Sequence, residues 1–156
     1  MTHTEPRLTV IARGAAAGTA ATTLMSAVLE VGQRMTSSWR QPPTLIVRTA
    51  LAGGPAHKLA GEDVLAIMAH LGYGTSCGAL FALLSRRGLR PSPAVGVGYG
   101  LLLWLISYAA WVPAMRAIPL PQHDCPGRQS TLIGAHVVYG VVLATTLRRL
   151  RRRSWT

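Results

Sequence analysis

The chain has 156 residues, of which 49% are hydrophobic and 13% charged, and its 16 basic against 5 acidic residues give a formal charge of +11. A soluble domain carries about 25% charged residues, so this composition argues against one. A basic balance is typical of nucleic-acid-binding proteins or of membrane proteins with basic loops. Because the arginines lie between long apolar runs, the sequence favours a membrane protein and no nucleic-acid partner.

Four segments are long and apolar enough to cross a bilayer, which takes roughly 20 residues. They are expected at about 8–31, 64–84, 94–115 and 131–147. Their Leu and Ala content favours helix. The predicted fold class is therefore all-α, an integral membrane four-helix bundle that forms a single transmembrane domain over residues 1–156.

Three of the segments contain two glycines four residues apart, which places both glycines on one face of a helix. These pairs are Gly14 and Gly18, Gly74 and Gly78, and Gly96 and Gly100. Such pairs allow helix backbones to approach closely in lipid. We expect them to serve packing within one bundle rather than a homodimer face.

The connection between the first two segments, residues 32–63, has a pattern of its own. Pro42 and Pro43 precede an apolar stretch that includes Leu45, Ile46 and Val47. Proline is favoured in the first turn of a helix. A short helix lying on the outer membrane surface is therefore predicted here.

The distribution of basic residues sets the orientation, because cytoplasmic loops carry an excess of Lys and Arg. Arginines cluster at the N-terminus, in the connection between the second and third segments, and after the fourth segment. Both termini are therefore expected in the cytoplasm, and the protein in a bacterial inner membrane as two parallel helical hairpins. Its expected partners are the lipid bilayer and a second copy of the chain or a larger membrane complex.

A six-residue pattern, A-H-x-x-Y-G, occurs twice in the apolar runs. The first copy is Ala69–Gly74, "AHLGYG", and the second is Ala135–Gly140, "AHVVYG". Ionisable residues within a membrane are costly and usually face the interior of the bundle. The repeat therefore marks His70 and His136 as candidate site residues.

Other polar or amphipathic residues fall at a similar depth, in the outer third of the four segments, given a rise of about 1.5 Å per residue. The complete candidate polar site is Glu30, His70, Tyr73, Tyr108, Trp111, His136 and Tyr139. An imidazole without a partner in hydrocarbon costs several kcal/mol. Glu30 and the two tyrosines of the repeat are the expected partners of the histidines.

Several stretches together resemble the YagU-like family of uncharacterised bacterial inner-membrane proteins. They are "LEVGQRMTSSWRQPPTLIVR", "AHLGYGTSCGALFALL", "GVGYGLLLWLISYAAWVPAM" and "AHVVYGVVLATTLRRLRRR". The resemblance implies four membrane helices, with an acid in the first helix and a histidine in the second and fourth. Those positions correspond to Glu30, His70 and His136.

Three functions stay open at this point. A structural or regulatory membrane protein with a buried Glu/His site is the first, and a small transporter or proton-linked channel is the second. The third is a redox module in which His70 and His136 hold haem b; otherwise no cofactor is expected, and any metal stays unknown. No Ser/His/Asp set, paired carboxylates or phosphate-binding loop indicates an enzyme.

Overall fold

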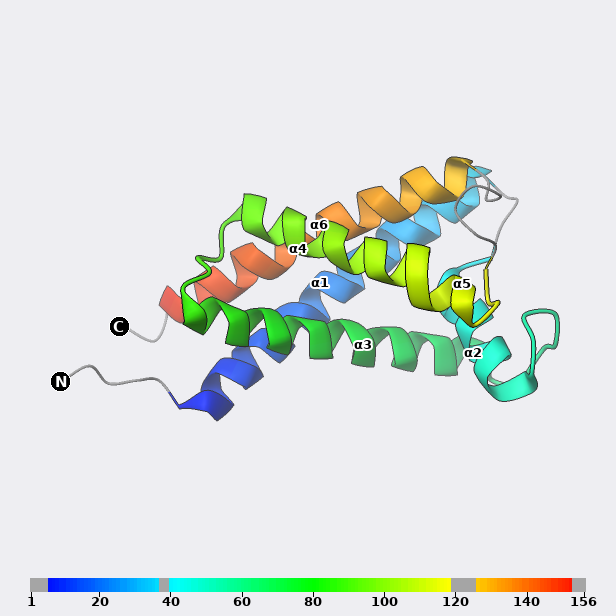
Figure 1. The fold of residues 1–156 in the computed structure, drawn as a ribbon, viewed down its shortest axis with the longest axis horizontal. Coiled ribbons are helices and arrows are strands. Elements are labelled where there is room, and N and C mark those ends of the chain that lie inside the picture. Colours follow the sequence, from blue (N-terminus) through cyan, green and yellow to red (C-terminus); the bar gives the residue numbers. More distant parts are fainter. Residues whose placement is uncertain (1–5, 37–39, 119–125, 153–156) are drawn as a thin grey trace.

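The computed structural model describes residues 6–36, 40–118 and 126–152, and these residues form helices without any strand. Four helices run side by side along the length of the molecule (Figure 1): α1 (Arg7–Thr36), α3 (Glu62–Leu84), α4 (Pro93–Ile106) and α6 (Pro126–Arg152). The prediction of an all-α protein is confirmed. The α3 helix begins and ends close to the predicted limits, α1 and α6 extend further, and α4 ends at Ile106, before its predicted limit.

Shorter elements connect them. After α1 the chain forms α2 (Pro42–Ala52), and a 3-10 turn, η1 (Ser85–Arg87), ends the α3 helix. The α4 helix continues into a π-helical turn, η2 (Ser107–Trp111), and then α5 (Val112–Ala114). Because α2 begins at the proline pair, the predicted short helix is confirmed, whereas its position on a membrane surface stays a prediction.

Three helices of the described residues are long and apolar enough to cross a membrane, judged by length and composition. They cover Glu62–Arg87, Pro93–Ala114 and Gly127–Arg152. The α1 helix, predicted as a span over residues 8–31, is not among them. Its run of small residues is diluted by threonines and by Arg13 and Glu30, which lowers its hydropathy.

Glycines hold the helices together in pairs. The α1 helix packs against both α3 and α6, and α4 packs against α6. A Cβ atom added at Gly14 would lie 2.6 Å from the carbonyl oxygen of Gly78, and one added at Gly18 would lie 2.6 Å from that of Gly74. The glycine pairs therefore serve packing within the chain, as the sequence predicted.

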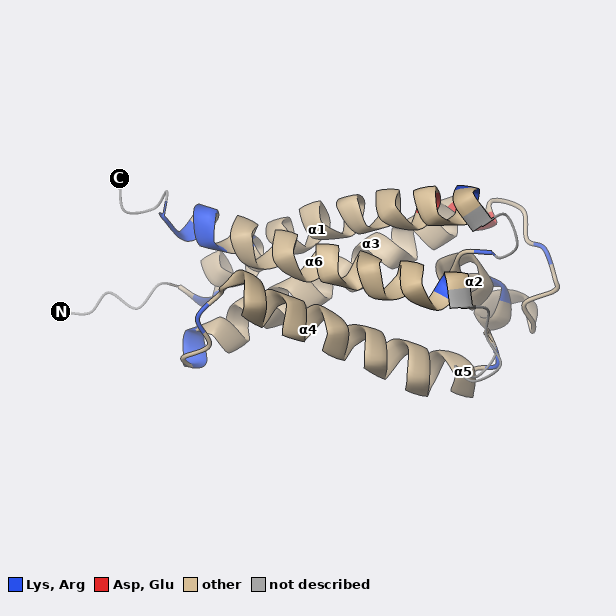
Figure 2. Ribbon diagram, turned by 90° about the horizontal axis from the view of Figure 1, so that it is seen from above, with Lys and Arg blue, Asp and Glu red and all other residues tan. Residues whose placement is uncertain are grey.

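Charged residues gather at the two ends of the molecule and leave the length between them almost uncharged (Figure 2). The start of α1, the turn between α3 and α4, and the end of α6 lie at the same end (Figure 1). The cluster Arg86, Arg87, Arg90, Arg148, Arg149, Arg151 and Arg152 is at this end. We call it the arginine end, and we call the opposite end, where α2 lies, the α2 end.

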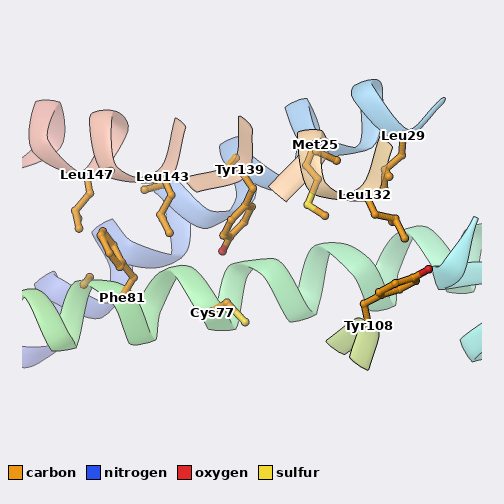
Figure 3. Close-up of a cluster of buried hydrophobic side chains, with 14 of the residues drawn as sticks. Met25, Leu29, Cys77, Phe81, Tyr108, Leu132, Tyr139, Leu143 and Leu147 are labelled. Carbon is orange, nitrogen blue, oxygen red and sulfur yellow. The ribbon is translucent and has the colours of Figure 1, made fainter. Parts of the chain in front are cut away.

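The buried core follows the length of α6. Tyr139, Leu143 and Leu147 project from α6 toward α3, and Phe81 and Cys77 meet them from α3 (Figure 3). Toward the α2 end, Met25, Leu29 and Leu132 lie on one side and Tyr108 on the other (Figure 3).

Candidate functional site

Toward the α2 end, the helices line a partly open cavity of about 310 Å³. Residues of α1, α2, α3, α4, η2 and α6 line it. Six of the seven residues predicted for the polar site are among them, namely His70, Tyr73, Tyr108, Trp111, His136 and Tyr139. The structure therefore brings these six to one place, and their role in binding stays a prediction.

Glu30 is the exception, because it does not line this cavity. Its Oε1 accepts a hydrogen bond from Arg34 at 2.8 Å, and its Oε2 accepts one from Gln41 at 2.9 Å. Glu30 instead lines a second, polar pocket of about 440 Å³. The described residues thus bond Glu30 to Arg34 and Gln41 in place of the predicted histidine partners, although His70 lines the same polar pocket, and a role of Glu30 in a shared site stays a prediction.

The repeated tyrosines do not pair with the histidines either. Tyr139 of the second repeat donates to the carbonyl oxygen of Gly74, in the first repeat, at 2.8 Å. The hydroxyl of Tyr73 lies 3.3 Å from that of Ser107 in η2. Each repeated tyrosine thus crosses to a neighbouring helix, and the predicted Glu–His–Tyr hydrogen-bond network is absent from the described residues.

The two histidines differ in their hydrogen bonds. His136 uses Nδ1 to bond the carbonyl oxygen of Leu132, one turn earlier in its own helix, at 2.8 Å. The Nε2 atom of His70 is buried and has no hydrogen-bond partner among the described residues. Two imidazoles at one cavity are compatible with metal ligation, although the described residues hold no cluster of three or more His, Cys, Asp or Glu.

Trp104 contributes a second buried nitrogen without a partner, and the sequence analysis did not select it. Its Nε1 has no hydrogen-bond acceptor among the described residues, and its ring lines the cavity. The Trp104 ring stacks on that of Tyr108, with centroids 5.6 Å apart and planes at 19°. Its spacing from Tyr108 is the signal that could have selected Trp104, because residues four apart share a helix face.

The π-helical turn, which the sequence analysis also missed, lies at the cavity. Pro113 has no N–H to donate and its ring crowds the carbonyl of Ala109 four residues earlier, so regular helix cannot continue through this region. The chain widens into η2 immediately before it. Ser107, Tyr108 and Trp111 of this turn all line the cavity.

A buried ion pair fixes α2 over the cavity. Arg48, whose surface is 3% exposed, binds Glu62 with its Nε 2.8 Å from Oε2 and its Nη2 bonded to Oε1. This hydrogen-bonded carboxylate raises the pKa of Arg48. Pro42, Pro43 and Ile46 of α2 line the cavity. The ion pair therefore holds α2, which forms one wall of the cavity, against the start of α3.

An all-helical protein with three helices fit to cross a membrane, and with a cavity at one end of them, belongs to the class of candidate polytopic membrane proteins. Residues 8–156 match the family of unknown function DUF6789, and the chain belongs to that family. No curated protein and no solved structure matches the chain. These comparisons give no link to the YagU-like family that the sequence resembles.

Proposed function

We propose that all four long helices cross the inner membrane of a bacterium, with both termini in the cytoplasm. The α1 helix packs between α3 and α6, so it must enter the membrane if they do. Its polar side chains have partners there: Thr22 donates to the carbonyl oxygen of Gly18 at 2.7 Å, and Thr19 lies 2.8 Å from the hydroxyl of Thr75. At 30 residues, α1 is about 45 Å long, which exceeds the thickness of a bilayer core.

The arginine end supports this orientation, because Lys and Arg accumulate on the cytoplasmic side. Reporter fusions after Arg153 are expected to be active only as cytoplasmic markers, and fusions near Gly53 only as external ones. The opposite pattern would contradict the proposed orientation and place the cavity toward the cytoplasm.

We further propose that the cavity binds a small, mostly apolar molecule that is taken up from the membrane. The observation that carries this proposal is that two residues of the cavity wall, His70 and Trp104, each have a buried nitrogen, Nε2 and Nε1, without a partner among the described residues. A buried polar group without a partner costs roughly 1–3 kcal/mol. A purely structural polar cluster would satisfy both groups internally, whereas a binding site leaves them for its ligand.

The shape and chemistry of the cavity agree with such a ligand. Its volume lies at the small end of the range of about 300–1,000 Å³ found for ligand pockets. Aromatic and aliphatic side chains dominate the wall, and a few polar atoms lie among them. This composition is the usual one for sites that bind small organic molecules.

Naphthalene, a small apolar ring, provides the first test. We expect it to shift the indole N–H signal of Trp104 in the NMR spectrum of the full chain in nanodiscs. Ala69, an exposed residue that lines the cavity, is the position at which to block it. The Ala69→Phe variant should lose the shift, and Met68→Phe, at an exposed neighbour that lines neither pocket, should keep it.

A signal of Trp104 that does not respond to naphthalene in the wild-type protein would overturn the binding proposal. An equal response in Ala69→Phe and Met68→Phe would also contradict it, because the probe would then act through the lipid.

Proton-linked transport is the second candidate, and the position of His70 favours it. The His70 imidazole lines both the cavity and the polar pocket, which Glu30 and Asp63 also line. An imidazole that lines two neighbouring pockets is suited to relay a proton from one pocket to the other. This candidate predicts proton flux into liposomes that contain the protein and loss of the flux in His70→Gln; absence of flux in the wild type would contradict it.

A further inference from the structure

The polar atoms of the cavity wall define the chemistry of the ligand, on the basis of the proposed binding function. We infer that the ligand is a neutral hydroxylated aromatic ring of the phenol or quinol type. Its hydroxyl donates a hydrogen bond to His136, and its oxygen accepts one from Trp104.

His136 requires a donor from the ligand. A carbonyl oxygen can only accept, so the 2.8 Å contact between Nδ1 and the carbonyl of Leu132 places the proton on Nδ1. In a neutral imidazole the other nitrogen is then an acceptor. The Nε2 atom is not the one that contacts the carbonyl of its own helix, and the His136 residue lines the cavity. An O–H or N–H group of the ligand is the partner that this atom can use.

Trp104 requires a hydrogen-bond acceptor from the ligand. An indole nitrogen is only a donor, and Nε1 of Trp104 is buried without an acceptor. A ligand oxygen satisfies this group. A hydroxyl group combines both properties, because its oxygen accepts while its hydrogen is donated.

The rest of the wall selects a neutral, flat molecule. No Lys, Arg, Asp or Glu of the described chain lines the cavity, so a charged ligand would lack a counter-charge. Two aromatic pairs border the space: Trp104 with Tyr108, and Tyr73 with Trp111, whose centroids are 6.2 Å apart. Aromatic rings favour offset or edge-to-face contacts with one another, which a planar ligand can extend.

Three naphthalene-sized probes separate these requirements. Naphthalene has no polar group, 1-methoxynaphthalene has only an acceptor, and 1-naphthol has both a donor and an acceptor. Their dissociation constants are measured on the full chain in nanodiscs by the Trp104 indole signal and, in variants without it, by displacement of bound tritiated naphthalene. We expect wild type to bind 1-naphthol about tenfold more tightly than 1-methoxynaphthalene, which corresponds to about 1.4 kcal/mol.

Two variants show which side chain causes the preference for 1-naphthol over 1-methoxynaphthalene. His136→Leu removes the acceptor and should bind 1-naphthol and 1-methoxynaphthalene equally. Trp104→Phe removes the donor and should weaken the binding of both probes by a similar factor while the preference for 1-naphthol is kept. The wild-type comparison needs no variant, so it decides the inference even if one of the two variants fails to fold.

Equal affinity of wild type for 1-naphthol and 1-methoxynaphthalene would overturn the inference. If naphthalene still binds in that case, the cavity is a binding site for apolar molecules and the proposed function stands. If none of the three probes binds, the proposed function fails together with the inference. A preference for 1-naphthol that persists in His136→Leu would also contradict the role assigned to His136.

Discussion

The arginine end and the α2 end of the helices are built from different side chains. Toward the arginine end, glycines allow backbones to touch: a Cβ atom added at Gly78 would lie 2.5 Å from the carbonyl oxygen of Gly14. Gly96 and Gly140 make a corresponding contact between α4 and α6. Toward the α2 end, α3 meets η2 through the aromatic side chains of Tyr73 and Trp111. Glycine contacts between backbones thus join the helices toward the arginine end, where Phe81 and Tyr99 also meet, and two of the three aromatic pairs of the described residues border the cavity at the other end.

This difference explains where the cavity forms. Helices joined by glycine leave no space between their backbones, whereas aromatic rings of α3, α4, η2 and α6 line the cavity. Of the four tyrosines in the sequence, three line the cavity, as does Trp104. The scarce aromatic residues of this chain are therefore concentrated where the helices separate.

Substitution of a packing glycine should have the largest effect on this arrangement. Gly78→Leu should lower the free energy of unfolding by about 1–3 kcal/mol or more, because its side chain would overlap the backbone of α1. Gly98→Leu is the matched control, since a Cβ atom at Gly98 would meet nothing within 4 Å. Thermal unfolding of the purified proteins measures both, and equal stability of the two variants would show that the α1–α3 contact is not required.

Removal of the ion pair at the α2 end should have the next largest effect. Arg48→Leu leaves the Glu62 carboxylate without its cation and releases α2 from the start of α3, so the melting temperature should fall. It should also speed the exchange of naphthalene, because α2 covers the cavity. Lys58→Leu, at an exposed position in the same connection, should change neither quantity. An Arg48→Leu protein with unchanged ligand exchange would mean that α2 is not the cover.

Replacing the repeated tyrosines should give smaller changes of unequal size. Tyr139→Phe removes a buried 2.8 Å hydrogen bond to Gly74 and should cost about 1 kcal/mol of unfolding free energy. Tyr73→Phe removes a 3.3 Å contact from a side chain that is 42% exposed, and should cost less. Chemical unfolding in mixed micelles compares the two; a larger loss for Tyr73→Phe would contradict the positions described.

The sequence predicted the positions of the helices better than it predicted which side chains form hydrogen bonds or ion pairs. Apolar length located α3, α4 and α6, and the proline pair located the start of α2. The A-H-x-x-Y-G repeat and equal depth selected six residues of the cavity. These predictions depend on the position of a residue along a helix, which the rise per residue determines.

Predictions of which polar side chains pair with one another failed, although the glycine pairs were assigned to packing within the chain as the structure has them. Glu30 was assigned to the histidines from depth alone, but Arg34 and Gln41 compete for it. The ion pair of Arg48 with Glu62 was not predicted, since nothing in the sequence indicates that α2 folds back on the start of α3. The widening at η2 precedes Pro113, and the sequence analysis made no prediction for this turn.

The central claim is that both copies of the repeat serve one cavity, and a double-mutant cycle on its histidines tests this claim most directly. The quantity is the affinity for 1-naphthol in wild type, His70→Ala, His136→Ala and the double variant. Substitutions within one site are non-additive, so the double variant should lose little more affinity than the weaker-binding single variant. Losses in binding free energy that add up would show two independent histidines and would contradict a shared site.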